Sequence, residues 1–395
     1  MKVLMFGWEF PPVNSGGLGT ACYGLTKGLS RKNIEVTLVL PDYPEDLKAE
    51  FVKIISSNNI KLKKISTILM PYMSSSNYSQ TINKRNARIY GNTLFHEINR
   101  YAEAAKKIAM EEEFDIIHCH DWMTFKAGIN AKAIKKKPLV VHVHATEFDR
   151  TGGNGVNDHV YHVEKEGMEN ADAVIAVSNY TKNTITRHYG ISPEKIRVVH
   201  NAVEFEHKID DKSKIKKINK VVLFLGRITL QKGPDYFVYA AKKVLQHEKN
   251  ARFVIAGNGD MEPFIIEKAA EMGIADKVLF AGFLQGEDLE RAYKMADVYV
   301  MPSVSEPFGI TPLEAMSNNV PVIISRQSGV SEVIRHCLLV DFWDIDDISS
   351  KIISVLRYMP LKESLSENGF GEVKKFNWDI PAQKCVEVYN EVLAA

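Results

Sequence analysis

The chain has 395 residues, 45% hydrophobic and 25% charged, with a formal net charge of +1. This length exceeds one compact α/β unit and suits two, and the near-neutral charge gives no whole-chain attraction to nucleic acid. The four cysteines are scattered without a CxxC pair, which argues against a disulfide framework and against a cysteine zinc site.

The first predicted strand is Lys2 to Trp8, a continuous apolar run typical of a parallel sheet that is covered on both faces. Glu9 and two prolines interrupt this run, so it predicts a strand and not a signal peptide. No apolar stretch approaches the ~20 residues of a membrane span. We therefore expect a cytoplasmic protein.

A glycine-rich segment that contains Gly16 and Gly17 leads into a predicted helix ending near Arg31, and a strand over Ile34 to Leu40 follows. This order superficially suggests a dinucleotide-binding fingerprint. However, these glycines come eight or more residues after the strand, whereas that fingerprint needs them in its tight first turn, so NAD binding is rejected. The glycines suit a mobile loop whose backbone comes close to a sugar or phosphate.

Two later predicted strands, DIIHCH and PLVVHVHA, each carry a His-x-His pair. Alternate residues of a strand face the same way, so His118 with His120 and His142 with His144 raise a metal hypothesis. No further Cys, His or Asp cluster supplies ligands at a recognisable spacing. We therefore expect no metal, and we expect His118 and His142 to be ordinary buried or hydrogen-bonded histidines.

His144 differs from the other three because it ends its strand at the carboxyl edge, where open α/β sheets place their ligands. A loop rich in Gly and Asn follows at Thr151 to Gly155. Predicted strands at Ala173 to Ser178 and Ile196 to Asn201 then complete a first domain, which we expect to span residues 1–205.

A second domain is expected over residues 206–376, beginning with a strand at Val221 to Arg227. A helix is predicted to start at Pro234. Arg227 and Lys232 flank the turn between that strand and that helix. A guanidinium forks to oxyanions and an ammonium adds a mobile point charge, so both cations can converge on one anion.

Strands and helices continue to alternate through this domain. Phe283 and Leu284 follow the end of a strand predicted at Val278 to Gly282. They are candidate contacts to a nucleobase, and the competing interpretation is that both are apolar core residues.

The stretch Ser303 to Val320 (SVSEPFGITPLEAMSNNV) contains a loop and then a short helix. Thr311 is the predicted N-cap, Pro312 suits the first helical position, and Glu314 completes a capping box. A helix that opens after a glycine loop presents free amides and a positive dipole end to phosphate. Glu306 and Glu314 can face one ligand, unless Glu314 only caps its helix and Glu306 is a solvated loop acid.

The segment EPFGITPLE, Glu306 to Glu314, resembles the Glu-x7-Glu signature of retaining, nucleotide-sugar-dependent glycosyltransferases of the GT-B fold. The closest types are family four and the related glycogen and starch synthases. The resemblance covers nearly the whole chain. It implies two Rossmann-like parallel-sheet α/β domains facing a central cleft, with the last helix, 377–395, crossing back to the first domain.

The resemblance also assigns roles to individual residues. Arg227 and Lys232 clamp the donor's diphosphate, Glu306 holds sugar hydroxyls, and His144 touches the transferred sugar. Glu314 holds the ribose hydroxyls. The full set of donor-binding residues comprises Gly16, Gly17, Phe283, Leu284, Gly309, Ile310, Thr311 and Glu314. No cofactor or metal is expected, because the two cations neutralise the diphosphate.

The segments SGGLG, HDW and EPFGIT resemble glycogen and starch synthases more than lipid-directed members. The favoured function is therefore glucosyl transfer from ADP- or UDP-glucose to an α-glucan. Asn14 stands where those synthases often carry a lysine, which argues against the bacterial ADP-glucose enzymes specifically.

Three alternatives stay open. A family-four transferase would use another nucleotide sugar and a glycan, lipid or small-molecule acceptor, and the lysines at 61, 63, 64, 132 and 135–137 would then touch an anionic membrane. A second alternative, from another class, is a catalytically inactive nucleotide-sugar-binding module. A pyridoxal phosphate-dependent phosphorylase shares the fold, but the chain has no recognisable cofactor-lysine signature. The sequence does not fix the oligomeric state.

Overall fold

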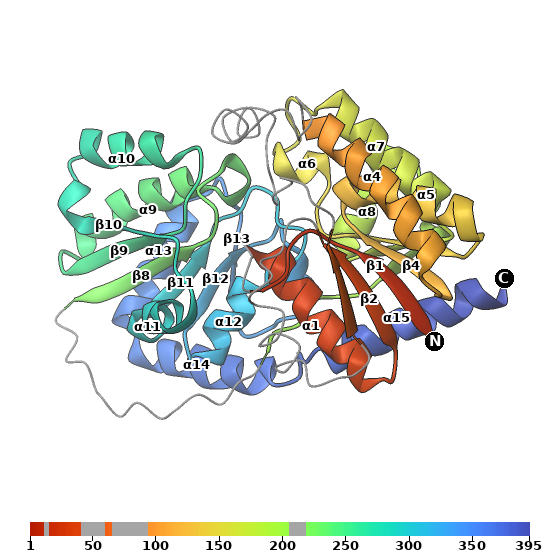
Figure 1. Cartoon of the computed structure of the whole chain (residues 1–395). Coiled ribbons are helices and arrows are strands. Elements are labelled where there is room, and N and C mark those ends of the chain that lie inside the picture. Colours follow the sequence, from red (N-terminus) through yellow and green to blue (C-terminus); the bar gives the residue numbers. More distant parts are fainter. Residues whose placement is uncertain (12–15, 41–59, 65–93, 205–218) are drawn as a thin grey trace. The chain divides into compact units, whose positions relative to one another are not determined.

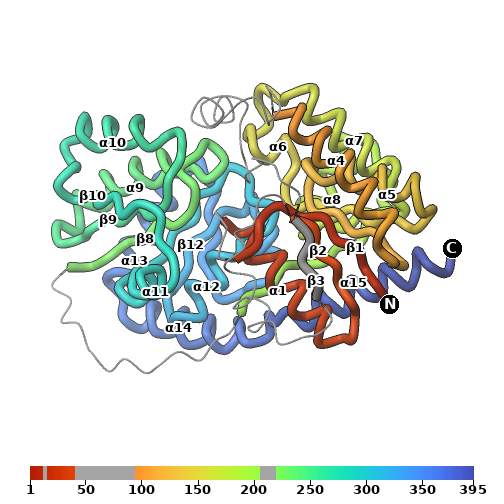
Figure 2. Tube along the Cα trace, viewed as in Figure 1, coloured from red at the N-terminus to blue at the C-terminus, as the bar shows by residue number. Residues whose placement is uncertain are grey.

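The computed structural model describes residues 1–11, 16–40, 60–64, 94–204 and 219–395 (Figures 1 and 2). These residues form two compact units: 1–147, 156–202 and 378–395 make the first, and 148–155 with 203–377 make the second. Asn14 and the domain boundary predicted at 205–206 lie outside the described residues. No helix in the described ranges is long and apolar enough to cross a membrane.

The first unit is built on a sheet of seven parallel strands in the order β3-β2-β1-β4-β5-β6-β7. The strands are β1 Lys2–Phe6, β2 Glu35–Leu40, β3 Ile60–Lys64, β4 Ile116–His120, β5 Leu139–Val143, β6 Ala173–Ala176 and β7 Ile196–Val198. Every residue of β4 and β5 is buried, as expected for strands that helices cover on both faces. The sequence predicts all of these strands except β3.

Helices of the first unit are α1 Gly17–Arg31, α4 Leu94–Glu111, α5 Trp122–Lys135, α7 Asp158–Asn170, α8 Asn179–Tyr189 and α15 Asp379–Ala394, with the 3₁₀ turn η2 at Pro193–Lys195. The short helix α6, Glu147–Arg150, runs from the first unit into the second. α15 belongs to the first unit because its start packs on α1. A Cβ added to Gly24 would lie 2.1 Å from the Trp378 ring, so the glycine permits this contact.

The second unit is built on a sheet of six parallel strands in the order β10-β9-β8-β11-β12-β13. The strands are β8 Lys220–Leu225, β9 Ala251–Ala256, β10 Val278–Gly282, β11 Val298–Met301, β12 Val322–Ser325 and β13 Leu338–Val340. The helices are α9 Pro234–His247, α10 Glu262–Glu271, α11 Gly286–Met295, α12 Thr311–Ser317, α13 Ile345–Arg357 and α14 Met359–Val373. The 3₁₀ turns are η3 Leu230–Lys232, η4 Ala275–Lys277 and η5 Gly329–Glu332.

Each sheet has a point at which the strand order reverses direction. In the first unit β1 pairs with β2 on one side and with β4 on the other, and in the second β8 pairs with β9 and with β11. Ligands of open α/β sheets bind outside the carboxyl ends of the strands at such a point. In the second unit, the loops that follow β8 and β11 carry Arg227, Lys232, Glu306 and Gly309.

Candidate functional site

The turn after β8 carries two cations of the second unit, Arg227 and Lys232. Lys232 runs past Gly226, where an added Cβ would lie 3.9 Å from the lysine Cδ. Arg227 Nη2 donates a hydrogen bond of 3.1 Å to Gln231 Oε1, and Gln231 is buried. The Gln231 carbonyl in turn accepts a 2.9 Å hydrogen bond from the amide of Val304. Gln231 therefore fixes the guanidinium and ties this turn to the loop that follows β11.

Glu306 lies in the loop after β11 and is held at both its backbone and its side chain. Its amide donates to the Gln327 carbonyl and its carbonyl accepts from the Gly329 amide, each at 2.9 Å. Its carboxylate is ion-paired with the Lys232 ammonium and lies 3.4 Å from Ser303 Oγ. The two paired side chains are only 20% and 7% exposed. Glu306 is thus a buried, paired carboxylate, and the alternative of a solvated loop acid is wrong.

The backbone next to Glu306 bends so that three consecutive amides have no acceptor among the described residues. Gly309 has a φ of 99°, and a Cβ there would lie 3.2 Å from both Glu306 Cγ and Val330 Cγ1, so glycine is required. Within the described ranges, no residue accepts a hydrogen bond from the amides of Gly309, Ile310 or Thr311. Unpaired amides at a helix start form an anion-binding concavity.

The capping box predicted for α12 is wrong. The helix begins at Thr311 with Ile310 as its N-cap, and no side chain caps it. Thr311 Oγ1 is 2.7 Å from the Tyr299 hydroxyl, and Glu314 Oε2 accepts a 2.8 Å hydrogen bond from the Tyr293 hydroxyl. Both tyrosines are buried, and buried hydroxyls need partners, so these contacts take the two side chains away from the helix end.

Glu314 is consequently oriented by tertiary structure. Burial raises the pKa of this carboxyl group, and the hydrogen bond from Tyr293 acts in the opposite direction by favouring the ionised form. The interpretation that Glu314 merely caps its own helix is therefore excluded.

Phe283 and Leu284 follow β10 at the same carboxyl edge. Phe283 is 48% exposed, so the interpretation of this residue as core is wrong, while Leu284 is half-buried. The Gly257 amide donates a 2.7 Å hydrogen bond to the Gly282 carbonyl, and a Cβ on Gly257 would lie 1.9 Å from the Gly226 carbonyl oxygen. Backbone contacts thus hold the loops after β8, β9 and β10 together.

In the first unit, His144 comes directly after β5 and is held by Asp121. One Asp121 carboxylate oxygen accepts hydrogen bonds from the amides of His144 at 2.6 Å and Ala145 at 3.3 Å. Asp121 has a φ of 57° and a ψ of 172°, a conformation that is nearly restricted to glycine. Such strain persists where the surroundings enforce it, and here it places the carboxylate under the backbone of His144.

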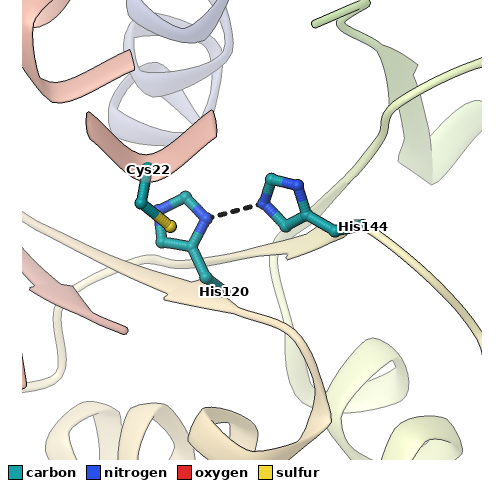
Figure 3. A group of neighbouring side chains, drawn as sticks. All are labelled: Cys22, His120 and His144. Carbon is teal, nitrogen blue, oxygen red and sulfur yellow. Dashed lines mark hydrogen bonds between the residues drawn. The ribbon is translucent and has the colours of Figure 1, made fainter. Parts of the chain in front are cut away.

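The side chain of His144 is joined to a second histidine. His120 Nδ1 and His144 Nε2 are 2.9 Å apart and share a hydrogen bond (Figure 3). His118 and His142 stack in the same group, with ring centroids 4.5 Å apart for His118 with His120 and 4.3 Å apart for His142 with His144. Burial lowers the pKa of all four imidazoles, that of His120 to about 3, so they are neutral near pH 7.

The two histidines that were expected to be ordinary buried residues are so. His118 Nδ1 is 2.5 Å from the Tyr389 hydroxyl on α15, and His142 is buried beside it.

Gly16 precedes α1 in an extended conformation, with φ of 176°, and Gly17 is the first residue of that helix. The Gly19 amide donates to the buried carboxylate of Glu9 at 2.8 Å, which anchors the helix start.

The structure therefore gathers Arg227, Lys232, Glu306 and the amides of 309–311 within the second unit, and it places His144 with Asp121 in the first. The sequence reasoning missed the residues that hold these groups in place: Asp121, Gln231, Tyr293 and Tyr299. Of these four residues, only Asp121 could have been found from the sequence, because it lies in the HDW segment on which the family resemblance partly rests.

Two family models match the chain and together cover most of it. Residues 15–207 match the model described as Glycosyltransferase Family 4, and residues 205–371 match the one described as Glycosyl transferases group 1. An uncharacterized glycosyltransferase of Methanocaldococcus jannaschii is 33% identical, over 98% of this chain and 98% of that protein.

More distant similarities agree with these matches. A glycogen synthase of Mycobacterium tuberculosis is 24% identical over 85% of this chain and 80% of its own length. Among solved structures, the sucrose-phosphate synthase of Thermosynechococcus elongatus superposes with a TM-score of 0.80 at 20% identity, covering 100% of this chain and 99% of that one.

Proposed function

The chain belongs to glycosyltransferase family 4 and has the GT-B fold, and on that premise we propose that it transfers glucose from ADP- or UDP-glucose to an α-glucan with retention of the α configuration. One arrangement in the second unit carries this proposal. The ion pair of Lys232 with Glu306 shares the turn after β8 with Arg227, and Glu306 adjoins Gly309, the first of three consecutive residues whose amides lack acceptors in the described structure.

This arrangement suits a nucleoside diphosphate that acquires charge as it leaves. Arg227 forks to phosphate oxygens, Lys232 adds a point charge, and the amides of Gly309 to Thr311 donate to the remaining oxygens. Because these donors are fixed before the reaction, they stabilise charge in the transition state without reorganisation. The two cations supply the neutralisation that a metal ion would otherwise provide, so the proposal includes no metal and no cofactor.

Glu306 and Glu314 are assigned to two different parts of the donor. Glu306, paired with Lys232, accepts hydrogen bonds from the sugar hydroxyls. Glu314 accepts from the ribose hydroxyls with the oxygen that Tyr293 leaves free. Phe283, which is exposed after β10, contacts the nucleobase together with Leu284.

His144 is assigned to the transferred sugar. Its Nε2 is engaged with His120, so Nδ1 is the ring atom that remains for a sugar hydroxyl. Lowering of its pKa by burial keeps the ring neutral, which allows a hydrogen bond to an uncharged hydroxyl without placing a second cation at the sugar. Gly16 and Gly17 precede and open α1, and we assign their backbone to the donor as well.

In the proposed step the bond between the sugar C1 and the phosphate oxygen breaks, and the nucleoside diphosphate leaves with the electron pair. The acceptor hydroxyl oxygen bonds to C1 on the same face, and its proton passes to the leaving phosphate oxygen. No second carboxylate is needed, in contrast to the paired acids of glycosidases.

The choice of acceptor is supported by the SGGLG, HDW and EPFGIT segments and by the similarity to a glycogen synthase. The structural likeness to a sucrose-phosphate synthase favours a second candidate, a family-four transferase with another nucleotide sugar and a different acceptor.

Release of nucleoside diphosphate from a panel of UDP-, ADP- and GDP-sugars distinguishes these candidates. Release that depends on added maltooligosaccharide or glycogen, and only with a glucose donor, supports the proposal. Slow hydrolysis of one donor that glucan does not accelerate supports the second candidate. Binding of a donor with no turnover under any condition would point to an inactive binding module.

A further inference from the structure

Three side chains with metal-binding atoms meet in the first unit although they come from separate elements. Cys22 lies in α1, His120 ends β4, and His144 follows β5 (Figure 3). One possible ligand atom of each residue, the thiol sulfur or a ring nitrogen, lies within 4.8 Å of the other two, and all three residues are buried. This cluster is not explained by the transfer reaction, which uses only His144.

The donor set has the chemistry of a zinc site. Thiolate and imidazole nitrogen are preferred ligands of Zn²⁺, and this cluster supplies one thiol and two imidazole rings. His120 Nε2 is buried and has no hydrogen-bond partner in the part of the chain that the structure describes. A buried polar nitrogen without a partner is costly, and an ion bound through this atom would give it one.

The distances are close to those that zinc requires. Because the three ligand atoms lie within 4.8 Å of one another, one point is at most about 2.8 Å from all of them, compared with about 2.3 Å for zinc to sulfur and about 2.0 Å for zinc to nitrogen. Inward shifts of at most about 0.5 Å for the sulfur and about 0.8 Å for each nitrogen therefore complete the site. A second trio, His118, His120 and His142, also has its nitrogens within 4.8 Å, but its rings are stacked at interplanar angles of 18–30°. Lone pairs lie in the ring planes, so stacked rings do not converge on one ion.

We propose that Cys22, His120 and His144 form an inhibitory site for Zn²⁺ or a similar divalent transition metal. Binding breaks the hydrogen bond between His120 and His144, releases the Cys22 proton, and captures the imidazole that we assign to the transferred sugar. Three protein ligands leave a fourth position for water. The inhibition rests on the proposed role of His144, whereas metal binding itself does not depend on any transfer activity.

Titration of the purified full chain with Co²⁺ tests binding without reference to catalysis. Cobalt bound to a thiolate in a four-coordinate site gives a sulfur-to-metal charge-transfer band in the near ultraviolet and intense visible bands. We expect these bands at one equivalent, their displacement by Zn²⁺, and their loss in Cys22→Ser. The control Cys337→Ser removes a more accessible cysteine outside the cluster and should keep the bands. Absence of the bands in the wild type, or their persistence in Cys22→Ser, would overturn the proposed site.

The inhibitory role is tested by measuring the turnover rate with and without Zn²⁺. The rate of each variant with Zn²⁺ is compared with the rate of the same variant without metal. We expect Zn²⁺ to reduce wild-type turnover at least tenfold and a chelator to restore it, with at most a twofold effect on Cys22→Ser. If Cys22→Ser does not fold, as judged by thermal unfolding, Cys22→Ala takes its place. If the cobalt bands appear but Zn²⁺ does not reduce the rate, the inhibitory role is wrong. If the bands appear but no nucleotide sugar of the panel is turned over, only the assigned transfer reaction is wrong.

Discussion

Lys232 forms an ion pair with Glu306 from a position 74 residues earlier in the chain, and both side chains are mostly buried. The two residues come from the loops after β8 and β11, the strands that adjoin at the reversal point of the second sheet. In the proposed function, this one contact fixes both the cation assigned to the donor's diphosphate and the carboxylate assigned to its sugar.

Replacing Lys232 with alanine should reduce turnover by about 10²- to 10³-fold, the usual effect of removing one fixed donor to developing charge. Because Glu306 would be left buried without its partner, the free energy of unfolding should also fall by about 3 kcal/mol. Denaturant unfolding and initial rates measure the two effects. The double variant Lys232→Met with Glu306→Gln removes both charges and should regain stability but not activity. Near-normal activity of Lys232→Ala would show that Lys232 does not clamp the diphosphate.

Tyr293→Phe should mainly affect donor binding. The change deletes the hydroxyl that donates to Glu314 and leaves the ring in place. If Glu314 holds the ribose in both the ground state and the transition state, KM for the nucleotide sugar should rise about tenfold with kcat nearly unchanged. Tyr358→Phe is the matched control, because that tyrosine is exposed. A fall in kcat at constant KM would instead connect Glu314 to the chemical step.

Asp121 should act by positioning His144. Asp121→Asn keeps an oxygen that can accept from the His144 and Ala145 amides, so a kcat within about threefold of the wild type is expected. Asp121→Ala removes the acceptor and should reduce kcat by about 10²-fold with little change in donor KM. Steady-state kinetics of the two variants test this prediction. Equal losses of kcat in both would show that the negative charge of Asp121 matters, and not its oxygen as a hydrogen-bond acceptor.

The four stacked histidines should make the fold sensitive to acid. Their folded-state pKa values are lowered by burial, whereas an unfolded chain binds these protons near pH 6.5. Below that pH the unfolded state binds more protons, so stability is full above pH 6.5 and is lost as the pH falls. Each histidine contributes up to about 1.4 kcal/mol per pH unit.

Unfolding free energies measured between pH 7 and 4 in the wild type and in His142→Leu isolate this effect. No described residue hydrogen-bonds to the His142 ring, so leucine should not destabilise the protein at pH 7. The unfolding free energy of the variant should depend less steeply on pH than that of the wild type, by an amount that corresponds to about one fewer proton taken up on unfolding. Identical slopes would mean that His142 titrates normally in the folded state.

Local sequence patterns predicted the strands and helices that lie around the site, because continuous apolar runs and glycine-bearing loops depend on near neighbours in the chain. The same reasoning placed Arg227, Lys232, Glu306 and Gly309 on loops at the carboxyl edge, where the structure has them. It did not predict β13 or α7, which have short or weakly patterned sequences.

The contacts that orient the site residues could not be predicted in this way. Thr311 and Glu314 fit a capping box locally, yet the hydroxyls of Tyr299 and Tyr293, brought in by β11 and α11, take both side chains. Gln231 reads as an ordinary loop residue until the fold places its side chain on Arg227. The two tyrosine contacts depend on which elements adjoin in the second unit, and periodicity within one segment carries no information about that. The contact of Gln231 with Arg227 is local, but it depends on the shape of the turn after β8, which periodicity does not give either.

Incorporation of labelled glucose from ADP- or UDP-glucose into glycogen is the most direct test of the proposed reaction, with Lys232→Ala assayed in parallel. We predict label in α-glucan that an α-specific glucan hydrolase releases, stoichiometric release of nucleoside diphosphate, and loss of both in the variant. Donor turnover that leaves glucan unlabelled, or labelling that survives Lys232→Ala, would contradict it.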